Sequence, residues 1–397
     1  MARRRRSDGG RADVVERARE AAMRLVLACR NLLHDRVNLC LVAAGVAIAI
    51  TLVHVQLGLF LGFRQMTSAM IDHAGAALWV VPKGTSNFDD PAGTLGIDPT
   101  AAAAVPGVSR ASPLVVGFAR WQAARGDATS VILIGTTAGA DRHLPWSSEV
   151  DAGTALRQPD AVVVDRTYAG DLGIARSGEL VQIEESRARI AGFTHGIRSF
   201  TTSPYVFTRI DRARNALGLE TGAATYLTIE LEEGAAPAGV QAELARRLPS
   251  AEVLTTAEFR ALNADHWLFS TGAGAALLSG AILGLAVGIA IVAQTLYGSA
   301  KDHLPQFATL RALGARSRYL VDVVLWQACA SGVLGYSVAL AAGAGIAAAT
   351  AGTAMPVVLS WPLAGLLLAL TLMICAGSSM AAVIRVLRVD PMLVLAR

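Results

Sequence analysis

Residues 272–297 read GAGAALLSGAILGLAVGIAIVAQTLY, an uninterrupted apolar run without Asp, Glu, Lys or Arg. A membrane-spanning helix needs about 20 such residues, and this run is too long for an ordinary buried helix. Three other runs share these properties, at residues 38–61, 323–346 and 363–384. The sequence therefore predicts a membrane protein with four transmembrane helices.

Charged residues are distributed unevenly around these runs. Residues 1–37 carry ten Arg against five acidic residues, and segments 298–321 and 385–397 are also net positive. Segment 62–271 instead carries 18 basic and 23 acidic residues. Because positively charged flanks stay in the cytosol, we expect both termini to be cytosolic and segment 62–271 to be extracytoplasmic. The net charge of +4 then reflects membrane topology, and no basic patch with interleaved aromatic residues points to nucleic acid.

The remaining segments flank the predicted spans. We expect residues 1–10 (MARRRRSDGG) to be a disordered basic leader. Residues 11–37 predict an amphipathic helix on the inner membrane surface, with simple anchoring by positive charge as the alternative. The other connections are a cytosolic loop at 298–322, a short extracytoplasmic loop at 347–362 and a cytosolic tail at 385–397.

Segment 62–271 is long enough to form a folded domain with its own core. It contains no cysteine, so it must be stable without disulfides. The chain after the first span is expected to continue outward as a helical stalk over residues 63–73. Alternating apolar and polar residues, bounded by Gly, Pro and Asp, then predict strands at 77–81, 114–122, 130–134, 161–164, 180–183, 187–193, 205–208 and 225–231. Helices are expected at 98–105, 210–216, 239–248 and 256–269, which makes this an α+β domain.

Catalytic motifs are absent from the sequence. The chain has two lysines, Lys83 and Lys301, and neither stands in the Gly-Lys-[Ser/Thr] sequence of a phosphate-binding loop. The HExxH, CxxC and GxSxG patterns are missing too. We therefore expect a non-catalytic membrane subunit that has no catalytic residue, metal site or cofactor of its own.

The second apolar run carries Gly280, Gly284 and Gly288 at four-residue spacing. Such a stripe allows another helix to approach closely, and the neighbour is either in this chain or in a second copy. Polar residues inside the four runs are few, chiefly His54, Gln56, Gln294 and Gln327. Their scarcity argues against a route for ions or polar solutes through the bilayer.

The cytosolic segment between the second and third runs contains a short predicted helix. Pro305 stands near its start and Gly314 at its end, the usual asymmetry of helix termini. Residues 303–314, with TLRALG at 309–314, resemble the coupling helix of FtsX/MacB-type ABC transporter permeases. The sequence RVDP at 388–391 resembles the closing motif of that family, and the four-span layout also matches. Within the family, residues 53–58 (VHVQLG), 77–81 (ALWVV) and 294–297 (QTLY) resemble the DevC-like branch.

The resemblance implies a fold and a set of contact residues. Segment 62–271 would be a MacB-like periplasmic domain with stalk ends, in a protein of the bacterial inner membrane. The residues that contact the ATPase would be His303, Pro305, Gln306, Phe307, Thr309, Leu310, Arg311, Leu313 and Gly314. The family often carries an acidic residue in this helix, whereas Gln306 and Ala308 occupy the corresponding positions here.

The resemblance also implies a function. The chain would be the permease subunit of an ABC-type export complex, which couples a separate cytosolic ATPase to movement of a periplasmic or outer-leaflet, hydrophobic substrate. ATP and Mg would be bound by that ATPase. The other partners would be a second copy of the chain, a periplasmic adaptor of the membrane fusion type and an outer-membrane channel. Two alternatives stay open: an FtsX-like signalling scaffold that activates a cell-wall hydrolase, and a membrane-anchored extracytoplasmic enzyme.

Overall fold

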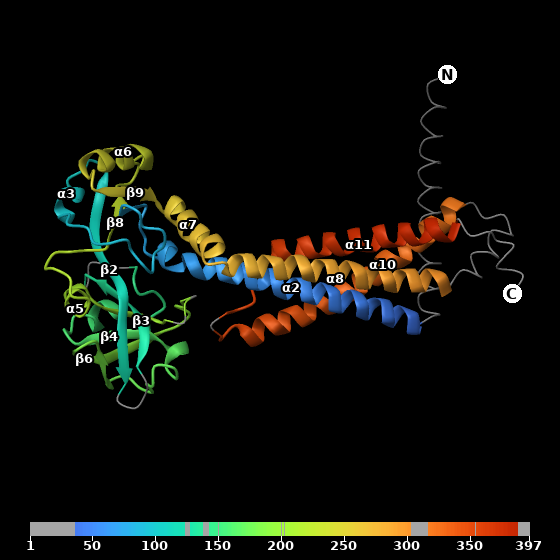
Figure 1. The fold of residues 1–397 in the computed structure, drawn as a ribbon, viewed down its shortest axis with the longest axis horizontal. Helices are drawn as coiled ribbons and strands as arrows, with labels where there is room; N and C mark the ends of the chain where they lie inside the picture. Colours follow the sequence, from blue (N-terminus) through green and yellow to red (C-terminus); the bar gives the residue numbers. More distant parts are fainter. Residues whose placement is uncertain are drawn as a thin grey trace, which may run out of the picture. The chain divides into compact units, whose positions relative to one another are not determined.

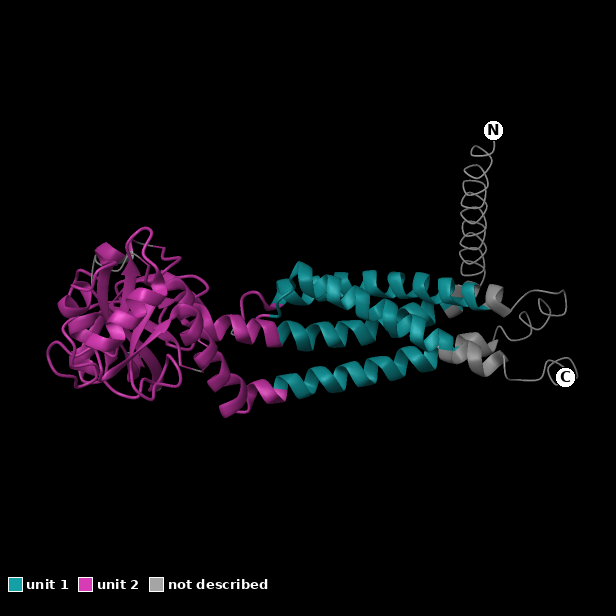
Figure 2. Cartoon of the chain, turned by 90° about the horizontal axis from the view of Figure 1, so that it is seen from above, with its two compact units in different colours: residues 1–59, 277–349, 357–397 teal, residues 60–276, 350–356 magenta. Residues whose placement is uncertain are grey.

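The structure is a computed structural model that describes residues 36–123, 128–137, 143–149, 151–199, 201, 203–302, 317–353 and 355–387. The chain divides into two compact units, which Figure 2 shows in different colours. One is a helical unit of residues 1–59, 277–349 and 357–397. The other, residues 60–276 and 350–356, contains the α+β domain. The predicted leader, the amphipathic helix and most of the tail lie outside the described residues.

Four long helices in the described chain are long and apolar enough to cross a membrane. They are α2 (Arg36–His73), α8 (Ala273–Asp302), α10 (Ser317–Thr350) and α11 (Trp361–Leu387), labelled in Figure 1. Their apolar spans are Leu39–His73, Ala273–Thr295, Val324–Thr350 and Trp361–Met380. The helix α2 is one helix of 38 residues, which continues beyond residue 61 through the predicted stalk at residues 63–73.

Successive helices of the helical unit alternate in direction along the chain. The helix α8 runs antiparallel to α2, since Gly45 lies by Thr295 and Gln56 by Gly280. The helix α10 runs parallel to α2, since Gly335 lies by Ala43 and Gly343 by His54. The start of α2 is thus at the same end of the unit as the end of α8 and the start of α10. These are the ends that carry the positive flanks in the sequence.

The domain contains nine strands among its described residues, joined in one hydrogen-bonded sheet in the order β3-β7-β4-β6-β5-β2-β8-β1-β9, with a further pairing of β3 to β2. Their bounds are β1 Leu78–Pro82, β2 Val108–Ala123, β3 Thr129–Thr136, β4 Ala161–Asp165, β5 Leu180–Ile183, β6 Ser186–Thr194, β7 Tyr205–Arg209, β8 Tyr226–Leu231 and β9 Ala251–Thr255. The helices are α3 Pro99–Ala103, α4 Ala152–Ala155, η1 Arg166–Tyr168, α5 Ile210–Ala216, α6 Pro237–Arg247, α7 Thr256–Asp265 and the π-helical turn η2 His266–Ser270.

The long strand β2 joins two parts of the sheet. Its first half, as far as Leu114, pairs with β8, and its second half pairs with β3 and then with β5. Because β3 also pairs with β7, the strands β2, β3, β7, β4, β6 and β5 close into a ring within the described chain. The pairs β3–β7 and β4–β6 are parallel, and the others in the ring are antiparallel.

Strand alternation sorts the core into separate clusters. One residue set of the ring strands forms a single buried cluster with α5: Val115, Trp121, Val131, Leu133, Val162, Val164, Val181, Ile183, Ala188, Ile190, Val206 and Ala213. Residues of the opposite parity, such as Val116 and Ile132, pack instead with Met70 of α2 and Phe259 of α7. A third cluster lies between β8, β1 and β9 and the helices α3 and α6. The ring therefore has its own interior, and its outer face packs against the stalk end of α2.

All eight predicted strands are present, β5 and α5 with the predicted bounds. One strand, β9, was not predicted; its five residues, AEVLT, lie directly between the helices α6 and α7. The helix predicted at 256–269 is not one regular α-helix. It ends at Asp265 and continues as the π-helical turn η2, after which Gly272 takes a positive φ of 75° before α8 begins.

Candidate functional site

The predicted ATPase-coupling residues His303, Pro305, Gln306, Phe307, Thr309, Leu310, Arg311, Leu313 and Gly314 lie outside the described residues. They fall between the end of α8 at Asp302 and the start of α10 at Ser317.

The glycine stripe of α8 faces α2 of the same chain. A methyl group added to Gly280 would lie 3.0 Å from Gln56 Oε1, and one added to Gly288 would lie 3.3 Å from Ala49 Cβ. At Gly284 the nearest atom, on Leu52, would be 3.5 Å away, an ordinary van der Waals distance. The stripe thus lets α8 pack along α2, most tightly at its two ends.

A second small-residue stripe, on α10, approaches α2 more closely. A methyl group on Gly335 would lie 2.7 Å from both Ala43 O and Val46 Cβ. One on Gly343 would overlap the imidazole of His54. Gly335, Ala339 and Gly343 are spaced four residues apart, like the glycines of α8, and small residues at this spacing allow close helix packing. Beyond Gly335, the stripe does not stand out in the sequence, because Ala339 and Gly343 stand in an Ala-rich run.

Polar side chains within the helical unit are mostly turned back onto their own helices. The hydroxyls of Thr295, Thr371 and Ser379 donate to the carbonyl four residues earlier, at 2.6, 2.6 and 2.7 Å. His54 is 1% exposed, and its Nε2 has no hydrogen-bond partner among the described residues. Gln56 lies against Gly280, and Gln294 is exposed on α8. The three hydroxyls are therefore satisfied within their own helices.

Three side-chain hydrogen bonds join α7 to the end of α2 and to the residues that follow it. Nearest the sheet, Thr256 Oγ1 donates to Ala76 O at 2.5 Å, and at the surface Arg260 Nε donates to Asp72 Oδ1 at 2.7 Å. The third contact is buried: Asn263 Nδ2 donates to Thr67 O at 2.6 Å. A capping box formed by Thr255 and Glu258 fixes the start of α7, with bonds of 3.1 and 2.7 Å.

A loop at residues 83–92 lies between these helices and the sheet. The backbone N–H of Phe88 donates to Asn263 Oδ1 at 2.8 Å. On the other side, Tyr226 Oη of β8 donates to Phe88 O at 3.0 Å, and Tyr205 Oη of β7 donates to Asp89 Oδ1 at 2.7 Å. Burial raises the pKa of the Asp89 carboxyl to about 6, partly offset by the hydrogen bond from Tyr205.

Four aromatic side chains hold this loop from within. Phe88 stacks on Tyr226 with ring centroids 5.5 Å apart and meets Trp79 edge-on at 6.0 Å. Phe259 of α7 lies 5.2 Å from Trp79. All four are at most 1% exposed. Their contacts join α7, the loop, β1 and β8 into one packed unit.

The domain has one further contact with a loop of the chain. The Arg198 guanidinium donates to Ala351 O at 2.5 Å, so the segment that follows α10 packs on the domain.

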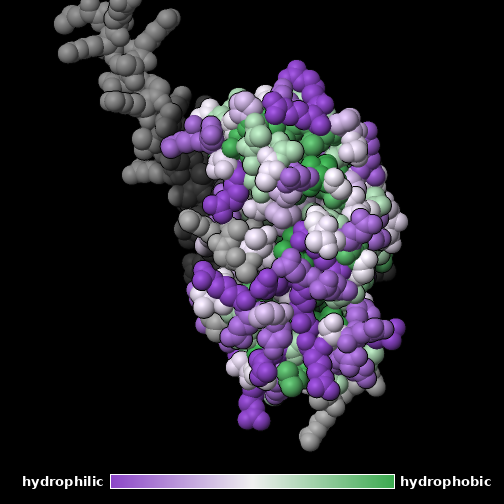
Figure 3. Space-filling view, turned by 90° about the vertical axis from the view of Figure 1, so that its left-hand side faces the viewer, coloured by the Kyte–Doolittle hydropathy of each residue, from purple (hydrophilic) through white to green (hydrophobic). Residues whose placement is uncertain are grey.

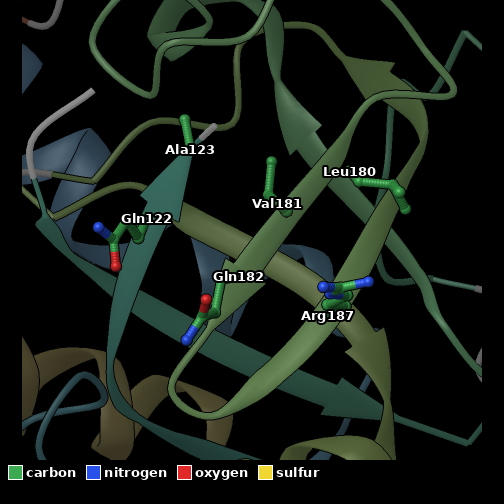
Figure 4. Close-up of a pocket in the computed structure, with 6 residues that line it drawn as sticks. All are labelled: Gln122, Ala123, Leu180, Val181, Gln182 and Arg187. Atoms are coloured by element: carbon green, nitrogen blue, oxygen red, sulfur yellow. The ribbon is translucent and has the colours of Figure 1, made fainter. Parts of the chain in front are cut away.

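A shallow groove lies on the ring, where β2, β5 and β6 meet (Figure 4). It has a volume of about 380 Å³ and is lined by Gln122, Ala123, Leu180, Val181, Gln182 and Arg187. Figure 3 shows one face of the domain, where hydrophilic side chains predominate and hydrophobic ones form small areas between them. Such a surface is expected of a domain in water. No group of three or more His, Cys, Asp or Glu residues that could hold a metal ion occurs in the described part of the chain.

Comparison with known proteins identifies both halves of the chain. The MacB-like periplasmic core domain matches residues 39–247, more than half of the sequence. The FtsX-like permease C-terminal domain matches residues 278–391.

The matched relatives are ABC transporter permeases, nearly the whole length of which aligns with this chain. An ABC transporter permease of Mycobacterium tuberculosis is 26% identical over 367 residues, which are 90% of this chain and 95% of that protein. A second M. tuberculosis permease is 24% identical over 365 residues, 90% of this chain and 94% of that protein.

Two solved structures resemble the domain only. The periplasmic region of MacB from Actinobacillus actinomycetemcomitans has 11% identity and a TM-score of 0.37, covering 47% of this chain and 92% of that one. The extracellular domain of the noncanonic ABC-type transporter YknZ from Gram-positive bacteria has 14% identity and a TM-score of 0.34, covering 45% and 99%. With the MacB-like match covering the first of four membrane-length helices and most of the domain, and the FtsX-like match covering the last three helices, this chain belongs to the MacB/FtsX-type family of ABC transporter permeases.

Proposed function

We propose that this permease is the mechanotransmitting membrane subunit of an export complex. A cytosolic ATPase docks on residues 303–314, and its ATP-driven closure moves the membrane helices. The movement reaches the extracytoplasmic domain, which displaces a hydrophobic substrate from the periplasm or the outer leaflet. A second copy of the chain, a periplasmic adaptor and an outer-membrane channel complete the complex.

The observation that carries this proposal is the continuity of α2. It runs without a break from Arg36 to His73, and its last turns pack into the core of the domain through Met70 and Ile71. An unbroken helix is stiff along its axis, because every turn is held by its own backbone hydrogen bonds. A displacement of its membrane portion therefore reaches the domain directly.

The polar groups of the helical unit support the same mechanism. A protein that carries ions or polar solutes through the bilayer lines the route with charged or polar side chains. In the described helices the hydroxyls of Thr295, Thr371 and Ser379 instead donate to carbonyls of their own helices. A substrate that is moved outside the membrane needs no such route.

The proposal is tested by affinity purification of the tagged chain in mild detergent, followed by mass spectrometry of the proteins that co-purify. Wild type is compared with Leu310→Asp, which places a charge in the coupling helix, and with Arg176→Ala. Arg176 is exposed on the domain, so its variant serves as the matched control.

We expect an ABC ATPase with wild type and Arg176→Ala, and its loss with Leu310→Asp. An adaptor among the co-purified proteins supports export, whereas a cell-wall hydrolase in its place contradicts it. Absence of any ATPase from the folded wild-type protein overturns the proposal.

A further inference from the structure

We infer that Asn263 is the positioning residue that transmits movement of the stalk to the loop at residues 83–92. This inference rests on the proposed function. We call Asn263, Thr67 and the loop together the stalk joint.

Asn263 connects three separate segments with one side chain. It is 1% exposed, donates to Thr67 O on α2 at 2.6 Å and accepts from the Phe88 N–H of the loop at 2.8 Å. A carboxamide is the group that supplies a donor and an acceptor at one short reach. Asp would keep the acceptor and Leu would keep only the shape. The chemistry at position 263 is therefore specific to the connection it makes.

The loop passes this connection on to both parts of the sheet. Phe88 receives the bond from Asn263 on its N–H and the bond from Tyr226 of β8 on its carbonyl oxygen. The next residue, Asp89, accepts from Tyr205 of β7, a strand of the ring. The loop is thus bonded to Asn263 of α7 on one side and to two separate strands on the other.

The break between α7 and α8 makes such a side-chain connection necessary. The α7 helix gives way to the π-helical turn η2 and then to Gly272, which has a positive φ of 75°. π-Helical turns interrupt the regular backbone hydrogen bonding of an α-helix. The backbone from α8 to α7 is therefore not one unbroken helix, and α7 is joined to α2 by lateral contacts.

Of the side-chain hydrogen bonds between α7 and α2, the buried one also binds the loop. The Asp72–Arg260 pair joins the same two helices, but its side chains are 32% and 47% exposed, and such exposed pairs contribute little. It also makes no bond to the loop. Asn263 is buried and is bonded to α2 and to the loop.

The test compares hydrogen–deuterium exchange in the full-length chain, in nanodiscs with its co-purified ATPase, with and without nucleotide trapped by vanadate. The variants are Asn263→Leu, which removes both bonds, and Asn263→Asp, which keeps the acceptor. Arg260→Gln is the matched control, because it loosens α2 from α7 without touching the loop. ATPase co-purification and thermal stability are measured for each variant.

In wild type we expect trapping to change exchange in α2, α7, the loop and β8. In Asn263→Leu the change in the loop should be lost, and loop amides should exchange roughly tenfold faster even without nucleotide. Asn263→Asp should lie between the two, and Arg260→Gln should behave as wild type.

Two results would overturn the inference in different ways. If trapping changes the stalk in Asn263→Leu and the change still reaches the loop, the joint does not act through Asn263, while the proposed function stands. If trapping changes nothing in the wild-type stalk, the proposed function itself fails, and the inference with it.

Discussion

At the scale of single residues, Asp89 places a titratable carboxyl in the core of the domain. It is 5% exposed, and burial raises its pKa from 3.8 to about 6. The folded state therefore holds the proton more tightly than the unfolded chain does. The free energy of unfolding should fall as pH rises from about 4 to about 6, by roughly 1.4 kcal/mol per pH unit.

Replacing Asp89 with Asn should remove this dependence. Asn keeps an oxygen that can accept from Tyr205 and carries no charge to desolvate. At pH 7 we expect Asp89→Asn to stabilise the domain by roughly 3 kcal/mol, and below about pH 4 to change little. Denaturation curves of the full chain in detergent, recorded from pH 4 to 8, measure the difference. The matched control is Asp90→Asn, at the exposed neighbour, and equal pH profiles for wild type and Asp89→Asn would refute the prediction.

Gly343 is a second residue whose role can be tested alone. A methyl group there overlaps the His54 imidazole, so Gly343→Ala should force α10 away from α2 and cost about 1–3 kcal/mol. Gly345, two residues on, has open space at the same position, and Gly345→Ala is its control. Thermal unfolding in detergent should separate the two variants. Equal melting temperatures would contradict the close approach of these helices.

At the scale of elements, α2 is the helix against which α8 and α10 both pack. The contact of Gly288 with Ala49 predicts a disulfide between cysteines at these positions, since the two Cβ atoms would lie 3.3 Å apart. In a variant without native cysteines, oxidation should link the two helices within one chain.

This crosslink is detected with a protease site engineered into the domain. After cleavage, the two fragments should stay together on a gel until a reductant is added. The pair Ala49→Cys and Gly345→Cys is the control, and no link is expected. Crosslinked dimers in place of linked fragments would show that the α8 stripe faces a second copy.

The strands and helices of the domain can be predicted from the sequence, but the closure of six strands into a ring cannot. Strands such as β5 and β4 are short apolar or alternating runs bounded by turn residues, and both were predicted. The ring depends on β2 pairing with β8 along its first half and with β3 and β5 along its second. No local pattern encodes that change of partner, because it is decided by which strands are available nearby.

The stalk joint could not be predicted for a similar reason. Asn263 stands in an ordinary amphipathic stretch, where an Asn is far more often exposed than buried. Its role comes from Thr67 and Phe88, which are distant from it in the sequence. The glycine stripe of α8 was visible because its spacing is local, and the stripe of α10 carries the same signal in Gly335, Ala339 and Gly343.

At the scale of the whole molecule, the alternating helix directions predict opposite locations for the two lysines. Lys83 is exposed in the loop of the domain, and Lys301 stands near the end of α8. The positive flanks place the end of α8 in the cytosol. An amine reagent that cannot cross the inner membrane should therefore modify Lys83 in spheroplasts and leave Lys301 unmodified.

The two sites are read separately by mass spectrometry of their peptides, and neither requires a substitution. Detergent-solubilised protein is the control, in which both lysines become accessible to the reagent. The result bears on mechanism as well as topology. If Lys301 were modified in intact spheroplasts, residues 303–314 would lie on the side away from ATP. A cytosolic ATPase could then not dock on these residues, and the proposed transmission of its movement through α2 would be wrong.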